Sequence, residues 1–295
     1  MKFQWTSDLG PLEGRAIFLS ASVPDPKRNP RFLKGPIGEA HMLRVIGARI
    51  DPAVKSLSAH VLQSGGRIVH GGHPKIFAPL ADQASNWHAE GAPPFIIYQS
   101  KYFAAEPPPP GRVEMERSNT AAIVWTPRNL GEVAQKFEIP EADIKRWLPL
   151  QAPEKAPHEL KEALLAMRIQ MLLETHPVAA VCIGGMEGIE AEARLYWDLV
   201  QQKRLPSSNG VFILESTFGA AKQLAPEPEV ISIEKEFAPE FSRRISEQTA
   251  RAELERPVLY DPIMSGFVRR LRKNEIQSEQ VKKSVRFEKR NDEMQ

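Results

Sequence analysis

The chain has 295 residues, of which 42% are hydrophobic and 26% charged, a composition typical of a globular protein with room for a sizeable core. Lys and Arg number 39 and Asp and Glu number 37, so the formal net charge is +2 and nucleic acid is not an expected partner. The single cysteine, Cys182, excludes an intramolecular disulfide and a zinc site of several thiolates. No apolar run approaches the ~18 residues of a membrane span. The first residues lack an apolar signal core, so we expect a cytoplasmic protein with no membrane partner.

Short apolar runs that alternate with helical patterns dominate the chain. The predicted strands are 15–19, 67–70, 94–99, 121–125, 179–183, 210–214 and a last short one at 230–233. Helix-like spacing of apolar residues predicts helices over 38–50, 51–63, 158–176 and 189–203. The pattern favours an α/β fold, a doubly wound, mostly parallel Rossmann-like sheet with helices on both faces.

Proline marks the connections between these elements. Asp51 and Pro52 supply a plausible N-cap and first position for the helix of 51–63. Proline accounts for 26 of the 295 residues, about 9% against a usual 5%, and it clusters in loops such as 106–111. Residues 100–118 are therefore predicted to be a proline-rich, charged connection.

The two ends of the chain differ in kind. We expect a Rossmann-like nucleotide-binding domain over 1–262 and a basic C-terminal tail, possibly helical, over 263–295. Residues 267–295 carry nine Lys or Arg and five acidic residues, a balance of 9 − 5 = +4. Such a tail could bind a phosphate backbone or an anionic membrane surface. The simpler interpretation is a solvated or partly helical tail that docks on a neighbouring subunit.

Four predicted strands end in small residues. In an open parallel sheet, ligands bind outside the carboxyl ends of the strands, near the point where the strand order reverses. Small residues there let backbone N–H groups approach a ligand, and helix N-termini favour phosphate. These ends predict a site for a nucleotide or sugar phosphate, formed by Ser20, Ala21 and Ser22; Gly71, Gly72 and His73; Gly184, Gly185, Met186, Glu187 and Gly188; and Ser216, Thr217 and Phe218.

Charged residues around these ends are further candidates. Glu187, Glu190 and Glu192 crowd the start of a predicted helix, where they could stabilise the helix dipole, bind ribose hydroxyls or take part in glycosidic-bond chemistry. Arg31 follows the first strand and could close over an anion. The histidines have no metal-ligand spacing, so neither a metal nor another cofactor is expected.

Four ordered segments together resemble the SLOG superfamily. They are IFLSASVPDP at 17–26, IVHGGHPKI at 68–76, IGGMEGIEAE at 183–192 and ESTFGAA at 215–221, and the resemblance spans about residues 12–225. This superfamily includes the Lonely Guy phosphoribohydrolases and nucleotide-sensing modules of bacterial antiphage systems. The resemblance implies that the serines of the first strand and the glycine loops line a nucleotide pocket.

The resemblance also implies a role for one glutamate. The hydrolytic relatives carry PGGxGTxxE, whose last glutamate assists N-glycosidic cleavage and corresponds to Glu192 here. This chain has Ile183 for the proline, one extra residue between the glycines, and Ile189 for the threonine. Where sensory relatives carry glycines, this chain has Glu215 and Phe218, and Phe218 could stack on a base or narrow the site.

The resemblance favours a sensor of an NAD-derived or ADP-ribose-like messenger in an antiphage system. A TIR-domain enzyme would make the messenger, and binding would change homo-oligomer assembly or activate a partner effector. The alternative is a nucleotide phosphoribohydrolase or NAD-type glycohydrolase that uses Glu192 with Glu190 or Arg194. A third possibility is a scaffold that assembles through its C-terminal tail.

Overall fold

The computed structural model describes residues 12–25, 30–33, 39–86, 93–152, 155–206, 210–239 and 257–292. Seven strands form one sheet in the order β4-β3-β2-β1-β5-β6-β7, and every neighbouring pair is parallel. The strands are β1 (Ala16–Ser22), β2 (Arg67–His70), β3 (Phe95–Ser100), β4 (Ala121–Thr126), β5 (Ala179–Gly184), β6 (Val211–Leu214) and β7 (Val230–Ser232). The α/β Rossmann-like prediction is confirmed, and each strand lies where the sequence predicted one.

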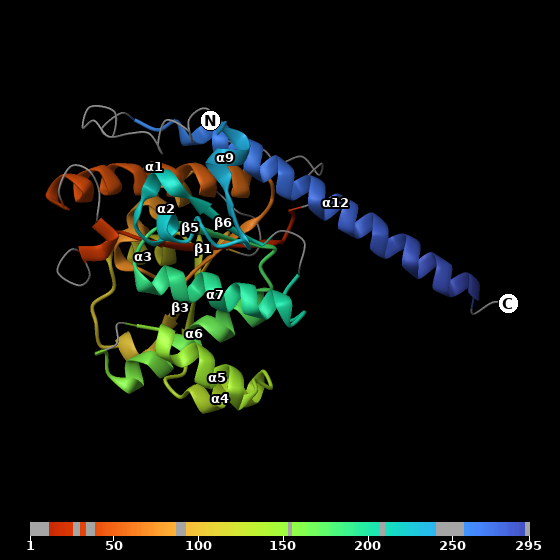
Figure 1. Cartoon of the computed structure of the whole chain (residues 1–295), viewed down its shortest axis with the longest axis horizontal. Helices are drawn as coiled ribbons and strands as arrows, with labels where there is room; N and C mark the ends of the chain where they lie inside the picture. The colour runs from red at the N-terminus through yellow and green to blue at the C-terminus, as the bar shows by residue number, and fades with distance from the viewer. Residues whose placement is uncertain are drawn as a thin grey trace.

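Helices cover both faces of this sheet (Figure 1). On one face lie α1 (Glu39–Gln63), α2 (Phe77–Ala84), α3 (Pro110–Arg117), α9 (Ile233–Phe237) and the start of α12 (Tyr260–Asp292). On the other lie α4 (Leu130–Lys136), α5 (Glu141–Trp147), α6 (His158–Thr175), α7 (Glu187–Gln201) and α8 (Gly219–Gln223). Short 3-10 turns complete the connections: η1 (Pro30–Leu33), η2 (Pro74–Ile76), η3 (Lys101–Phe103), η4 (Leu148–Leu150) and η5 (Glu215–Thr217).

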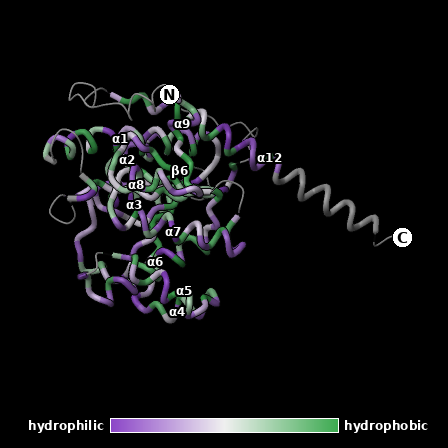
Figure 2. Tube along the Cα trace, in the orientation of Figure 1, coloured by the Kyte–Doolittle hydropathy of each residue, from purple (hydrophilic) through white to green (hydrophobic). Residues whose placement is uncertain are grey.

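The strands separate two hydrophobic cores. Because side chains alternate along a strand, Ile17 and Leu19 of β1 join the core under α1, whereas Phe18 joins the core under α6 and α7. Figure 2 shows hydrophobic residues gathered around the sheet and hydrophilic ones on outward-facing turns. Cys182 of β5 is fully buried in the second core, and burial raises the pKa of its thiol, as expected for an inert thiol.

The predicted break between two helices at Asp51 is wrong. One 25-residue helix, α1, runs through this point with Pro52 inside it. Proline removes one backbone hydrogen bond from a helix, but Ile50, Ala53 and Val54 are all fully buried around it. Packing of both segments on the sheet therefore outweighs the local proline penalty.

The proline-rich connection contains more order than predicted. After β3 come η3 and then, at the last of four prolines, the helix α3. Proline suits the first position of a helix because that N–H has no partner inside the helix. The predicted helices at 158–176 and 189–203 are confirmed as α6 and α7, each shifted by one or two residues.

The C-terminal segment is helical. The first turns of α12 bury Ile263, Met264, Phe267, Val268 and Leu271, a spacing of three and four residues that marks one helix face. These turns pack on α1 and β6 of the same chain, and the rest of α12 extends away from the sheet (Figure 1). The basic side chains after residue 277 lie outside the described residues. None of the described helices is long and apolar enough to cross a membrane.

Candidate functional site

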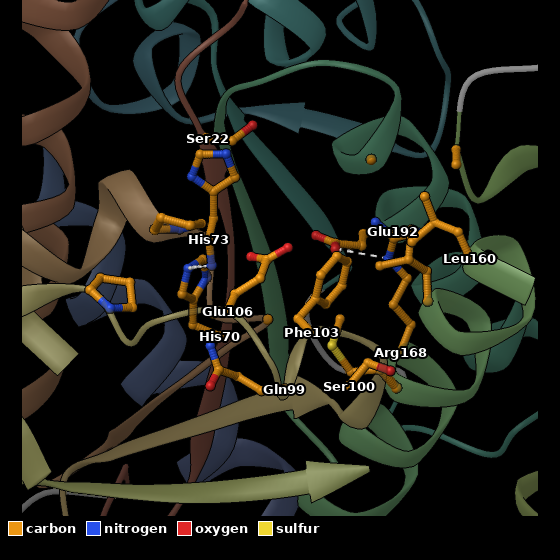
Figure 3. Close-up of a pocket in the computed structure, with 18 of the residues that line it drawn as sticks. Ser22, His70, His73, Gln99, Ser100, Phe103, Glu106, Leu160, Arg168 and Glu192 are labelled. Atoms are coloured by element: carbon orange, nitrogen blue, oxygen red, sulfur yellow. Dashed lines mark hydrogen bonds and ion pairs between the residues drawn. The ribbon is translucent and has the colours of Figure 1, made fainter. Parts of the chain in front are cut away.

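The strand order reverses at β1, which pairs with β2 on one side and β5 on the other. A cavity of about 1210 Å³ opens at the carboxyl ends of β1, β2 and β3, next to α6 and α7 (Figure 3). This is the place where a doubly wound sheet binds ligands. It is lined by Ala21, Ser22, His70, Gly71, Gly72, His73, Pro74, Gln99, Ser100, Phe103, Glu106, Pro107, Pro108, Pro109, Pro110, Arg112, Ala152, Lys155, Ala156, Leu160, Leu164, Met167, Arg168, Gly188, Ile189 and Glu192.

A carboxylate at the inner end of the cavity is held from two sides. The Ser20 hydroxyl donates to Oε2 of Glu192 at 2.5 Å, and Nε of Arg168 donates to Oε1 at 2.9 Å. Ser20 reaches it from β1, whereas Glu192 lies on α7, two turns into the helix that follows β5. The Glu192 side chain is 13% exposed, so only a small part of its surface faces the cavity.

Arg168 is itself fixed and buried. Its side chain is 6% exposed, and Nη1 donates to both the backbone oxygen (2.9 Å) and the side-chain oxygen (2.8 Å) of Gln151. A buried cation without partners would be costly, and here Glu192 and Gln151 supply them. Arg168 therefore holds Glu192 in one orientation through a buried ion pair.

The loop after β2 forms the opposite wall. His70 is buried; its Nδ1 donates to the Leu19 carbonyl at 2.9 Å, and its Nε2 accepts from the His73 N–H at 3.1 Å. This pair of contacts selects the neutral form with the proton on Nδ1, and burial lowers the pKa of His70. Gly72 has φ +70° and its backbone packs against the Gln99 side chain. Here glycine is needed because a Cβ would lie 2.9 Å from that side chain.

The loop after β5 packs tightly under α7. Gly184 N–H donates to the Thr217 hydroxyl at 2.8 Å, and a Cβ on Gly185 would lie 2.0 Å from Ile189. The Met186 sulfur accepts from Asp25 N–H at 3.2 Å. Most of this loop is therefore structural, and its last glycine, Gly188, reaches the cavity.

The loop after β6 is held by a separate buried network. Glu234 accepts from the N–H groups of Glu215 (2.9 Å) and Ser216 (3.0 Å), and Arg49 donates to the Ser216 carbonyl at 2.9 Å. The Ser216 and Tyr260 hydroxyls lie 2.7 Å apart. This network ties the start of α12 to the end of β6.

The comparisons with known proteins identify one family. The model of the SLOG cluster3 family matches residues 136–244. Over this segment the chain is similar to the SLOG cluster3 family, which suggests a nucleotide-related Rossmann-like domain. The comparisons with curated proteins and with solved structures found no match.

The SLOG segment supplies only part of the cavity. It contributes the faces of α6 and α7 that carry Arg168 and Glu192, whereas the strand ends from Ala21 to Ser100 precede it. Residues far apart in the chain thus meet at one site because β5 pairs with β1 along the whole of β5, from Ile17–Ala179 to Ser22–Gly184.

The structure brings some of the predicted SLOG site residues together and separates others. Ala21, Ser22, Gly71, Gly72, His73, Gly188 and Glu192 line the cavity, and Ser20 contacts Glu192. Outside this lining are Gly184, Gly185, Met186, Glu187, Ser216, Thr217 and Phe218.

Three charged candidates of the SLOG site also lie outside the lining. Arg31 pairs with Glu190 at 2.6 Å, and Arg194 lies 3.8 Å from Glu227 on the surface. Within the described part of the chain, no group of three or more His, Cys, Asp or Glu is placed to hold a metal ion.

Sequence reasoning missed most of the outer cavity wall. Phe103, Arg112, the four prolines and the α6 residues lie in segments that were predicted as a connection or as an ordinary amphipathic helix. One signal was available: Arg168 interrupts the apolar run AMRIQM of α6, and a charge in a buried stripe calls for a partner. The partner, Glu192, could not be identified before the fold was known.

Proposed function

We propose that this protein binds a nucleotide in the cavity at the end of β1, with ribose hydroxyls on Glu192, and acts as a sensor of an NAD-derived or ADP-ribose-like messenger. The observation that carries the proposal is the Glu192 carboxylate, held by Arg168 and Ser20 at a cavity surrounded by glycine-rich strand ends. An ionised carboxylate is acceptor-only and each oxygen can accept more than one hydrogen bond. The two neighbouring hydroxyls of a ribose match that acceptor pair.

The rest of the cavity supports a phosphate-bearing ligand of some length. Gly188 presents backbone without a side chain in the first turn of the 15-residue α7, and helix N-termini favour phosphate. Drug-sized ligands occupy pockets of about 300–1,000 Å³, and this cavity is about 1210 Å³. That volume favours a ligand such as ADP-ribose over a single nucleoside.

Binding without turnover is the form that the contacts of Glu192 favour. Both of its carboxyl oxygens are engaged by protein donors, Oε1 by Arg168 and Oε2 by Ser20, whereas a general acid has to bring its own proton to the leaving base. In this proposal a TIR-domain enzyme of an antiphage system supplies the messenger in the cytoplasm. Occupancy then changes homo-oligomer assembly or the activity of a partner effector.

N-glycosidic hydrolysis is a second candidate function. Glu192 lies at the position of the glutamate in the hydrolytic relatives, and the structure places it at the cavity with an arginine beside it. An ionised carboxylate could stabilise the positive charge that develops on a ribosyl centre.

The first test is titration of the full chain with ADP-ribose, NAD and AMP by calorimetry, followed by chromatography of the nucleotides. We expect binding of at least one nucleotide, its recovery unchanged, and a roughly 10- to 100-fold loss of affinity in Glu192→Gln, because hydrogen bonds to a charged group are strong. Glu190→Gln is the matched control, since this carboxylate lies on the same helix and pairs with Arg31 outside the cavity lining.

The other outcomes separate the candidates. Liberated base that disappears in Glu192→Gln would establish the hydrolase. Equal losses in both variants, or no binding of any nucleotide by the wild-type protein, would contradict the proposed site. Because Glu192→Gln leaves Arg168 without its carboxylate partner, the melting temperature of each variant is measured first, and Glu192→Asp is included to keep the charge.

A further inference from the structure

The two ends of the cavity differ in chemistry. The inner end carries Ser22, Glu192 and Arg168 beside glycine backbone. The outer end is formed by Phe103, by Pro107–Pro110, and by Leu160 and Leu164. Figure 3 shows Leu160 on the α6 side, with Phe103 and Glu106 drawn between α6 and the two histidines in this view. Glu106 and Lys155 also line the cavity, so a ligand that fills it meets this apolar surface with charged groups beside it.

The proline wall cannot act as a phosphate site. Proline has no N–H, so four in succession offer carbonyl oxygens and apolar rings only. The helix that follows, α3, begins at Pro110, and the Arg112 N–H in its first turn donates to the Pro109 carbonyl at 3.0 Å. This wall suits a group without negative charge, and its fixed φ angles keep it in one shape.

The facing wall is one stripe of α6. Leu160, Leu164 and Met167 follow each other at four and three residues, which places them on the same side of a helix. Leu160 and Leu164 are half-buried, although they belong to a helix whose following turns are buried. Their apolar surface lines the same cavity as the ring of Phe103.

Polar side chains also line this part of the cavity, among them Gln99 and Arg112. Arg112 donates from Nη1 to Oε1 of Gln99, and this contact orients the Gln99 amide at the cavity wall. With Oε1 engaged by arginine, the amide presents its NH₂ donors. These donors match the ring nitrogens of a heteroaromatic base.

We propose that the outer end binds the planar, uncharged base of the ligand and that Phe103 stacks on it, so that Phe103 determines specificity for nitrogen heterocycles. This inference rests on the proposed function, since it takes the ribose to lie at Glu192. Aromatic side chains stack on bases of any sequence because every base has a π-face. The Gln99 amide NH₂ then donates hydrogen bonds to nitrogen atoms at the edge of the base.

The test compares AMP with ribose 5-phosphate, which lacks the base, on the full chain by calorimetry. The wild-type protein is expected to bind AMP more tightly than ribose 5-phosphate. Phe103→Ala should weaken AMP binding by roughly tenfold or more and change ribose 5-phosphate binding less than about twofold, and Phe103→Trp should restore AMP affinity. Tyr102→Ala is the control, because Tyr102 lies on the same turn, with its ring 5.2 Å from that of Phe103, but does not line the cavity.

Each contrary outcome has one meaning. Equal affinity for AMP and ribose 5-phosphate, or AMP binding that Phe103→Ala leaves unchanged, would overturn the base site and leave the nucleotide proposal standing. If neither AMP nor ADP-ribose binds the wild-type protein, the proposed function fails, and this inference fails with it.

Discussion

At the scale of single residues, the glycines of the β5–α7 loop have separate roles. Gly185 has φ +80°, and a Cβ there would lie 2.0 Å from Ile189. Gly188 is inside α7 and borders the cavity, with Arg168 Nη2 3.1 Å from the position of a Cβ. Replacing Gly185 therefore tests the fold, whereas replacing Gly188 tests the site.

Thermal melting and ligand titration should separate these two glycines. Gly185→Ala should lower the free energy of unfolding by at least about 2 kcal/mol, because left-handed backbone strain and overpacking add. Gly188→Ala should melt near the wild-type temperature and bind ADP-ribose more weakly. Gly47→Ala is the control: a Cβ there meets nothing within 4 Å, so in mid-helix it should be neutral or stabilising by up to about 1 kcal/mol. A well-folded Gly185→Ala would contradict the first expectation.

Some of the residues that line the cavity carry a local signal in the sequence. A strand followed by Gly71-Gly72 or by Ser22 points to a sheet edge open to ligands, and the structure places these residues around the cavity. Phe218 shows the limit, since it is only 4% exposed and the cationic groups of Arg49 and Lys222 lie over its ring, at 5.3 and 4.8 Å from the centroid. Tertiary contacts decide whether an aromatic ring packs against neighbouring side chains or faces a ligand site. The residue types that follow a predicted strand do not reveal these contacts.

At the scale of elements, the first turns of α12 belong to the hydrophobic core, whereas the rest of the helix extends away from the sheet. Phe267 is fully buried and packs edge-to-face on Phe212 of β6, with ring centroids 4.8 Å apart. Ile276, nine residues further along the helix, is 43% exposed. The same helix thus offers a buried and an exposed apolar side chain for comparison.

Urea unfolding should distinguish these two positions of α12. Phe267→Ala should cost about 3–5 kcal/mol, the usual range for a large buried aromatic, and Ile276→Ala should stay within about 0.5 kcal/mol of the wild-type value. Similar small losses in both variants would show that the start of α12 is not anchored on β6.

Helices were harder to predict than strands for a physical reason. Each buried parallel strand is a short apolar run with turn residues after it, and all seven were identified. Helix α1 continues through Pro52, and α3 starts inside a proline-rich stretch. In both places tertiary packing and the geometry of a helix start allow a helix to form, whereas the low helix propensity of proline alone predicts a break or a loop.

At the scale of the whole molecule, His70 links stability to pH. Both ring nitrogens are used in the neutral form, and burial lowers the pKa of His70 below its ordinary value of about 6.5. The unfolded chain therefore takes up a proton at a pH where the folded chain does not. The contribution of His70 to the free energy of unfolding should therefore be fully present above about pH 6.5 and should be lost as the pH falls below that value.

Free energies of unfolding at pH 7.5 and pH 5.5 check this expectation. The wild-type protein should lose about 1 kcal/mol more between these values than His70→Gln, because all other titrating groups are common to both proteins. Equal losses in the two proteins would show that His70 is protonated in the folded state as readily as in the unfolded one.

The β1–β5 pairing has a consequence for how the site forms. The contact between Ser20 and Glu192 joins residues 172 positions apart in the chain, and contacts of such long range form late and slowly during folding. During synthesis the inner end of the cavity cannot exist until α7 has left the ribosome and β5 has docked on β1. Ligand binding therefore reports that β5 and α7 have docked on β1, and a chain halted before α7 presents the first part of the cavity wall without Glu192.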